Sequence, residues 1–265
     1  MQQTDFMGKT LNYKVQGEGE KVIFLLHGYL ESLEIWDGFA DDLAENNKVI
    51  RMDIPGHGKS EVIQEQHDME LLAQGALHVL ETEKVESCIM VGHSLGGYVT
   101  LAFYEKYPEK LDGFSLFHSH PFADSEQVKE NRAREIDLVK KGRKNVIINT
   151  NIPKLFANDN LEKFKDQVEW VRNIALDTPD EGIIANLKGM MNRPDRSELV
   201  KNTNKPFLLI AGVNDNYVNY EEVIPNIVLP EKGSLITLEN SGHIGFVEEK
   251  EKALLALDDF VIFLV

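Results

Sequence analysis

The stretch Gly92-His93-Ser94-Leu95-Gly96-Gly97 constrains the fold more than any other part of the chain. An apolar run over residues 88–91 leads into it, and a run with helical character over residues 98–106 follows it. In this context Gly-x-Ser-x-Gly predicts a sharp strand-to-helix turn that lifts a serine hydroxyl above a sheet. Ser94 would take a positive φ, which is costly for a residue with a Cβ, and small neighbours two residues away on each side would avoid clashes. The alternative is an ordinary glycine-rich turn.

Strand-like and helix-like runs alternate over the remainder of the chain. The strand-like runs are short and mostly apolar, and they cover residues 11–15, 21–26, 48–53, 87–91, 111–117, 206–211 and 234–238. Apolar residues at helical spacing mark residues 34–46, 69–80 and 248–263. This alternation predicts an α/β fold with a doubly wound, mostly parallel sheet covered on both faces. Gly17 and Gly19 predict a hairpin-like turn after the first strand.

The middle of the chain has a different pattern. Residues 121–203 are helical and charged, without a strong strand signal, and helices are predicted over 125–141, 161–174 and 179–191. Strands of the same predicted sheet lie on both sides of this block. We therefore expect a core made of residues 1–120 and 204–265, with a helical insertion over 121–203.

Composition limits the partners and the compartment. The 265-residue chain has a net charge of −16, which disfavours nucleic acid and anionic membranes as partners. Its single cysteine, Cys88, lies in an apolar run, so an internal disulfide is excluded and a reducing compartment is permitted. No secretory signal is visible, and the apolar residues 254–265 are too few and too charged to span a bilayer. We expect a cytoplasmic protein with a small-molecule substrate; the oligomeric state stays open.

Polar residues of complementary chemistry follow three of the predicted strands. Ser94, Asp215 and His243 each come just beyond a strand, at the edge where parallel sheets place ligands. Serine is a weak nucleophile until a base removes its proton, and that base is usually a histidine whose tautomer a carboxylate fixes. Glu239 and Asp124 are the alternatives to Asp215 as the carboxylate.

In this order the chain resembles the serine α/β-hydrolases of the capped, small-molecule type. The matching residues extend from 27 to 243; they are His27-Gly28, Asp53-x-Pro55-Gly56-His57-Gly58-x-Ser60, Gly92-His93-Ser94-Leu95-Gly96-Gly97, Asp215 and Ser241-Gly242-His243. The resemblance implies that Ser94 is the nucleophile, His243 the base and Asp215 its orienting acid. It also implies an oxyanion hole formed by the backbone N–H groups of Tyr29 and Leu95, and a helical cap that roofs the site.

The other histidines have structural explanations. His27 and His93 stand beside glycines and are expected to form structural hydrogen bonds. His118 and His120 form an H-x-H pattern at a strand end, where they could line a pocket; without a carboxylate or thiol at ligand spacing nearby, we predict no metal site. A dinucleotide-binding glycine motif and a phosphate loop are both missing, so no cofactor is expected.

The predicted activity is that of a serine hydrolase that acts through an acyl-enzyme, most simply on a small, soluble carboxylic ester. Thioesters, amides and activated lactones are open as substrates. A C–C bond hydrolase or a synthase-type lyase would use the same triad, and a weakly catalytic ligand receptor could retain it. Dehalogenases and epoxide hydrolases of this fold place aspartate at the elbow, where this chain has Ser94.

Overall fold

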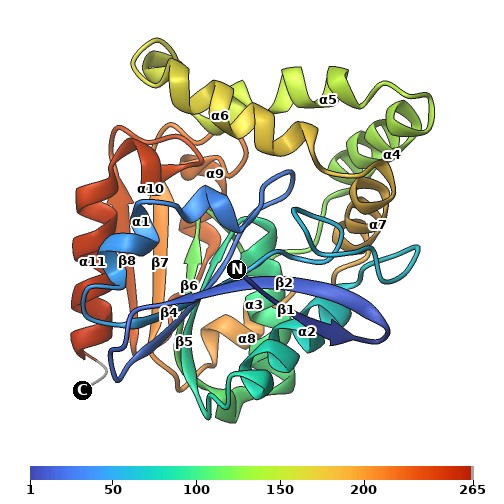
Figure 1. Ribbon diagram of the computed structural model, residues 1–265. Coiled ribbons are helices and arrows are strands. Elements are labelled where there is room, and N and C mark those ends of the chain that lie inside the picture. The colour runs from blue at the N-terminus through green and yellow to red at the C-terminus, as the bar shows by residue number, and fades with distance from the viewer. Residues whose placement is uncertain (264–265) are drawn as a thin grey trace.

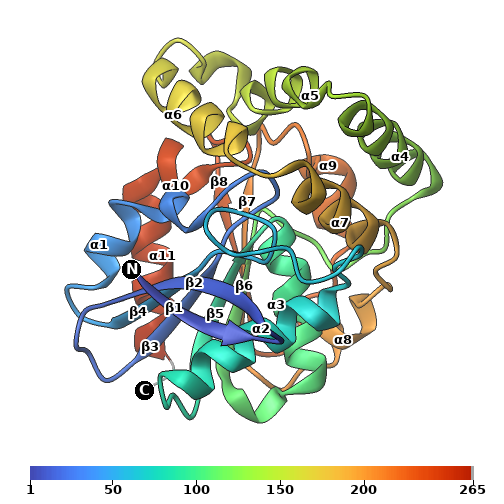
Figure 2. The same cartoon turned by 45° about the vertical axis from the view of Figure 1, so that its right-hand side comes forward.

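The computed structural model describes residues 1–263, and its centre is an eight-stranded sheet (Figures 1 and 2). The strands lie in the order β1-β2-β4-β3-β5-β6-β7-β8, and all except β2 run in the same direction. They are β1 (Gln2–Phe6), β2 (Lys9–Gln16), β3 (Val22–Leu26), β4 (Lys48–Met52), β5 (Cys88–His93), β6 (Leu111–Phe117), β7 (Phe207–Gly212) and β8 (Gly233–Leu238). The predicted mostly parallel α/β sheet is confirmed.

Helices cover both faces of the sheet. In Figures 1 and 2, α1 and α11 lie on one side of it, and α2, α3 and α8 (Ser197–Lys201) lie on the other. The helices outside the middle of the chain are α1 (Phe39–Leu43), α2 (Met69–Thr82), α3 (Leu95–Lys106), α9 (Tyr220–Val223), α10 (Gly245–Glu248) and α11 (Lys250–Phe263). The continuous apolar runs of β5 and β7 follow from this arrangement, because every residue of these two strands is buried.

Two local predictions were wrong. Gly17 and Gly19 do not form a hairpin, because β2 pairs antiparallel with β4 and not with β3. The chain needs glycine here for another reason: a Cβ on Gly17 or Gly19 would lie 2.0 or 2.1 Å from a backbone oxygen of the segment before β4. The single helix expected over 34–46 is a 3-10 turn, Leu33–Trp36, followed by the short α1, and the two are separated by Gly38 at φ +74°.

Only helices and loops occupy the segment between β6 and β7, all of which the structure describes. The helices are α4 (Glu126–Lys140), α5 (Lys144–Asn151), α6 (Lys165–Leu176), α7 (Asp180–Met191) and α8 (Ser197–Lys201). Figure 1 shows α4, α5 and α6 above the edge of the sheet from which the chain leaves β7 and β8. Helix α7 is fixed to the core, since Asn186 Nδ2 donates to the carbonyl oxygen of Pro55 at 2.9 Å. Of the helices in the described part of the chain, none is long and apolar enough to cross a membrane.

Candidate active site

The turn at Ser94 has the strain and the close packing that the sequence pattern predicts. Ser94 is the single residue between β5 and α3, and its φ of 49° is unfavourable for a residue with a side chain. A Cβ on Gly92 would lie 2.3 Å from the carbonyl oxygen of Gly96, and one on Gly96 would lie 2.3 Å from that of Leu26. Both positions therefore require glycine. The Ser94 side chain is left half-buried at the start of α3.

His243 and Asp215 form a buried hydrogen-bonded pair from two neighbouring loops. His243 follows β8, Asp215 follows β7, and His243 Nδ1 lies 2.7 Å from Asp215 Oδ2. The backbone N–H groups of Tyr217 and Val218 donate to the other carboxylate oxygen at 2.7 and 2.9 Å. Burial alone would raise the pKa of Asp215, but the charge of His243 and hydrogen bonds from His118 and His243 hold it below its ordinary value. Asp215 is therefore an anion that orients the imidazole.

Neither of the alternative acids contacts His243. Asp124 Oδ2 and Oδ1 accept hydrogen bonds from Arg132 and Arg193 at 2.7 and 2.5 Å. Glu239 is exposed and pairs with Lys252 on α11. The structure thus brings only Asp215, of the three carboxylates considered, next to the histidine.

His93, which directly precedes Ser94, contacts the loop that carries His243. The His93 and His243 rings lie 5.0 Å apart, and His93 Nε2 lies 2.8 Å from the His243 carbonyl oxygen. Within residues 1–263, no hydrogen bond joins the Ser94 hydroxyl to His243. Such contacts are often loose in unliganded enzymes and tighten when substrate binds.

Two backbone N–H groups that the sequence predicts as an oxyanion hole, those of Tyr29 and Leu95, have no acceptor in the described part of the chain. Leu95 is the first residue of α3, so its N–H has no partner within the helix and lies at the positive end of the helix dipole. Tyr29 lies in the loop after β3. In the described part of the chain neither N–H donates a hydrogen bond to another group. Tyr29 and Leu95 are thus both available as donors.

His118 is a part of the site that sequence reasoning did not assign. Its Nδ1 lies 3.4 Å from Asp215 Oδ2, and its Nε2 accepts the N–H of Gly245 at 3.0 Å. Nδ1 also lies 3.2 Å from the backbone nitrogen of Gly212, whose N–H points toward it. Burial lowers the pKa of His118 to about 4, so the ring is neutral. The H-x-H pattern marked this residue, but only the fold shows that it lies behind Asp215. His120 points elsewhere, with Nε2 3.3 Å from the Tyr98 hydroxyl.

His118, Asp215 and His243 have ligand atoms within 4.8 Å of one another, as a metal site would require. Hydrogen bonds already engage these atoms: His243 Nδ1 and His118 Nδ1 face Asp215 Oδ2, and His118 Nε2 accepts from Gly245. A cation would have to break this network. The arrangement fits an acid and base relay better than a metal centre.

Two helices between β6 and β7 contact tyrosines of the loops that follow β3 and β7. The Tyr29 hydroxyl lies 3.4 Å from Glu135 Oε2 on α4, and the Tyr217 hydroxyl donates to the carbonyl oxygen of Asn151 on α5 at 2.9 Å. The Tyr217 ring lies 5.1 Å from the His243 ring. Side chains from the loop after β3 and from the loop after β7, next to His243, therefore both reach this helical layer.

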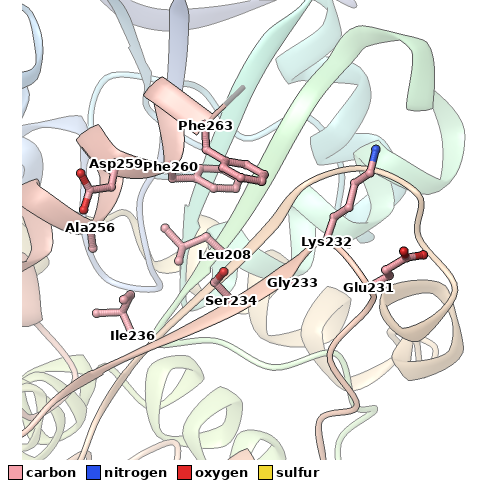
Figure 3. A pocket seen from close by; sticks show the side chains of 10 residues that line it. All are labelled: Leu208, Glu231, Lys232, Gly233, Ser234, Ile236, Ala256, Asp259, Phe260 and Phe263. Carbon is pink, nitrogen blue, oxygen red and sulfur yellow. The ribbon is translucent and has the colours of Figure 1, made fainter. Parts of the chain in front are cut away.

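A cavity of about 300 Å³ lies far from these groups. Figure 3 shows Phe260 and Phe263 of α11 beside Leu208 and Ser234, which stand near the beginnings of β7 and β8. Asp215 and His243 follow the other ends of these strands. This cavity is therefore at the opposite edge of the sheet from Ser94.

Comparisons with known proteins agree with this geometry. The family model described as "alpha/beta hydrolase fold" matches residues 21–134. A malate-bound thermophilic esterase from Thermogutta terrifontis superposes with a TM-score of 0.94 at 25% identity, covering 100% of this chain and 99% of that one. The enol-lactonase of Burkholderia xenovorans LB400 has the same fold (TM-score 0.90, 20% identity, 98% and 100% covered).

A curated relative is similar over almost its whole length. The (E)-2-((N-methylformamido)methylene)succinate hydrolase of Acinetobacter baylyi is 22% identical over 94% of this chain and 93% of its own. With the matched family model, the sheet order and the elbow at Ser94, these similarities identify the chain as a member of the α/β-hydrolase superfamily.

Proposed function

We propose that the protein is a serine hydrolase that cleaves a small ester-like substrate through an acyl-enzyme. One observation carries the proposal: a buried His243–Asp215 hydrogen bond of 2.7 Å next to a serine in strained backbone at the start of a helix. The esterase, the enol-lactonase and the succinate-derivative hydrolase among the similar proteins support hydrolysis as the reaction class.

Each residue has a defined role in this mechanism. His243 Nε2 accepts the Ser94 proton as Oγ attacks the substrate carbonyl, and Asp215 stabilises the imidazolium that forms. The N–H groups of Tyr29 and Leu95 bind the negative oxygen of the tetrahedral intermediate. The imidazolium then protonates the leaving group, and a water molecule activated by the neutral His243 releases the acid and regenerates Ser94.

The helical layer completes the proposed site as a cap. In this proposal residues 121–203 form the cap, and residues 1–120 and 204–265 form the catalytic core. The contacts of Tyr29 with Glu135 and of Tyr217 with Asn151 support it, because they connect α4 and α5 with the loops that follow β3 and β7. A cap in this position would exclude water and limit the size of the substrate.

The proposal is tested with short p-nitrophenyl esters and the variant Ser94→Ala. We expect multiple turnovers from the wild type and a loss of roughly 10⁴- to 10⁶-fold in kcat for S94A, since the nucleophile is removed. Ser115→Ala is the matched control: Ser115 is buried in β6 without a hydrogen-bond partner in the described chain, so its variant should keep full activity.

The same assay separates the alternatives. A ligand receptor on this fold would give at most a slow, single turnover. A C–C bond hydrolase or a lyase would leave every short ester intact while a phosphonate still labels Ser94. Stoichiometric labelling of a different serine would contradict the assignment of the nucleophile.

A further inference from the structure

A buried carboxylate and histidine form a further pair next to the proposed site. Glu31 and His93 are 1% and 0% exposed, and His93 Nδ1 lies 3.0 Å from Glu31 Oε2. The same carboxylate oxygen accepts the N–H of Gly28 at 2.6 Å. His93 Nε2, at the other side of the ring, lies 2.8 Å from the carbonyl oxygen of His243. None of these contacts takes part in the mechanism described above.

Geometry defines the protonation of His93. Both ring nitrogens face oxygen atoms that carry no hydrogen, a carboxylate on one side and a backbone carbonyl on the other. A neutral imidazole has a single N–H and could satisfy only one of the two. A doubly protonated imidazolium satisfies both, and its charge compensates that of the buried Glu31.

The electrostatics agree with this assignment. Burial opposes the charged ring, but the charge and hydrogen bond of Glu31 outweigh it and raise the pKa of His93 above its ordinary value. Burial likewise opposes the Glu31 anion, and His93 holds its pKa below the ordinary value. The titratable groups that face His93 are Glu31 and His27 from the β3 side, His118 after β6, Asp215 after β7, and His243 after β8.

This pair connects three segments that carry the proposed machinery. Glu31 and Gly28 belong to the loop that presents the Tyr29 N–H, and His93 directly precedes Ser94. The third segment is the His243 loop, held by its backbone carbonyl. The packing is tight, because a Cβ on Gly28 would lie 2.8 Å from His93 Nδ1 and 2.9 Å from Glu31 Oε2.

We propose that Glu31 and the protonated His93 are positioning residues, which hold the oxyanion-hole N–H of Tyr29 and the His243 loop in register with Ser94. The inference rests on the proposed function. The proposal predicts that full activity requires a positively charged His93. We therefore expect kcat to fall at alkaline pH, where the imidazolium of His93 loses a proton and becomes neutral. The neutral ring has a single N–H, so the hydrogen bond of His93 either to the His243 carbonyl oxygen or to Glu31 is then lost.

The test compares Glu31→Gln with the wild type on a p-nitrophenyl ester across a range of pH. Glutamine has the same shape and can still accept from Gly28, so the fold should persist. Without the anion, His93 deprotonates more easily, and the alkaline limb of the kcat profile should move down by about 1 to 3 pH units. We expect kcat below this limb to fall about 10- to 100-fold, less than complete loss of an oxyanion donor, with KM little changed.

Glu34→Gln is the matched control, since Glu34 lies three residues further on, is partly exposed, and its side chain makes no hydrogen bond within residues 1–263. E34Q should retain the wild-type kcat and pH profile. A folded E31Q enzyme with the wild-type kcat and the wild-type alkaline limb would overturn the inference. If E31Q does not fold, the double variant E31Q/H93Q replaces it, because it leaves no unpaired buried charge. This variant should have a reduced kcat and no alkaline limb. A wild-type kcat and a wild-type alkaline limb in the double variant would also overturn the inference.

A spectroscopic measurement separates this inference from the proposed function. In ¹⁵N-labelled wild-type protein at neutral pH, both ring nitrogens of His93 should carry protons, and in E31Q only one should. If the wild type lacks Ser94-dependent ester hydrolysis, the proposed function fails, while this measurement still decides the state of His93. A neutral His93 in the wild type would disprove the ion pair.

Discussion

Asp215 contacts two histidines with the same carboxylate oxygen. We therefore expect that its negative charge, and not only its shape, is needed to orient His243. Its Oδ2 faces Nδ1 of His243 at 2.7 Å and of His118 at 3.4 Å. In Asp215→Asn the amide nitrogen or oxygen must take this place, so the tautomer of His243 is no longer fixed. We expect kcat to fall by up to about 10⁴-fold, as for other triads.

Steady-state kinetics of Asp215→Asn alongside Glu239→Gln tests this expectation. Glu239 was one of the two alternative acids in the sequence, beside Asp124, and in the structure it is exposed and paired with Lys252. E239Q should therefore be as active as the wild type. Full activity of D215N would mean that another carboxylate orients the base.

The sequence predicted the positions of some residues of the site and not of others. Ser94 and His243 stand in short glycine-bearing motifs, and Asp215 follows a strand, so topology alone predicts that they converge. Glu31 and His118 stand in no such motif. Glu31 gains its role only because β3 and β5 are adjacent, which places His93 above its carboxylate. Contacts of this kind depend on which strands pair, and periodicity does not reveal strand order.

Among the elements, the buried strands and the long helices were the easiest to predict. Strand β1 was missed because it lies at the edge of the sheet and is largely exposed, so its sequence has no apolar face that would indicate a strand. Helix α5 was missed because its eight residues, KNVIINTN, combine β-branched and polar side chains that favour no single state. Weak local signals of this kind are decided by tertiary packing.

The proposed cap leads to a prediction about whether the enzyme prefers a dissolved or an emulsified substrate. On residues 121–203 the exposed large apolar side chains are Val128 and Val146, which stand on different helices, α4 and α5. A lid that opens at a lipid surface needs a continuous apolar face. We therefore expect no activation when the substrate forms an emulsion, and rates that peak at short acyl chains.

Hydrolysis of acyl esters of increasing length, below and above their solubility limits, measures this behaviour. A smooth decline across the solubility limit is the expected result. A sharp rise on emulsified long-chain triglyceride would identify a lipase and would require the cap helices to rearrange. Mixed micelles without substrate control for a nonspecific effect of the interface.

At the scale of the whole molecule, the buried histidines link stability to pH. Burial is the largest cause in each case: it lowers the pKa of His67, His118 and His120 to about 4, and that of His57 well below its ordinary value. Between pH 6.5, near the unfolded value, and about pH 4, the unfolded chain therefore binds more protons than the folded one. Stability should fall as the pH falls through this window.

Other charges act in the opposite direction or at lower pH. The raised pKa of His93 gives stability that is complete below pH 6.5 and is lost only as the pH rises above it, so it changes little within this window. Asp215 and Glu31, whose pKa values are lowered, lose their contribution only as the pH falls below their unfolded values near 4. The net charge of −16 also shrinks toward the pI of about 4.9, which reduces self-repulsion.

Urea unfolding between about pH 7 and pH 5, followed by tryptophan fluorescence, to which the buried Trp36 contributes, measures the balance. In roughly 0.5 M salt the exposed charges are screened, so the histidine effect should dominate, and the urea midpoint should drop steadily toward acid. His120→Gln should reduce this dependence by up to about 1.4 kcal/mol per pH unit, because one buried neutral imidazole is removed. A midpoint that is constant or rises toward pH 5 would show that the buried histidines accept protons in the folded state, which their surroundings oppose.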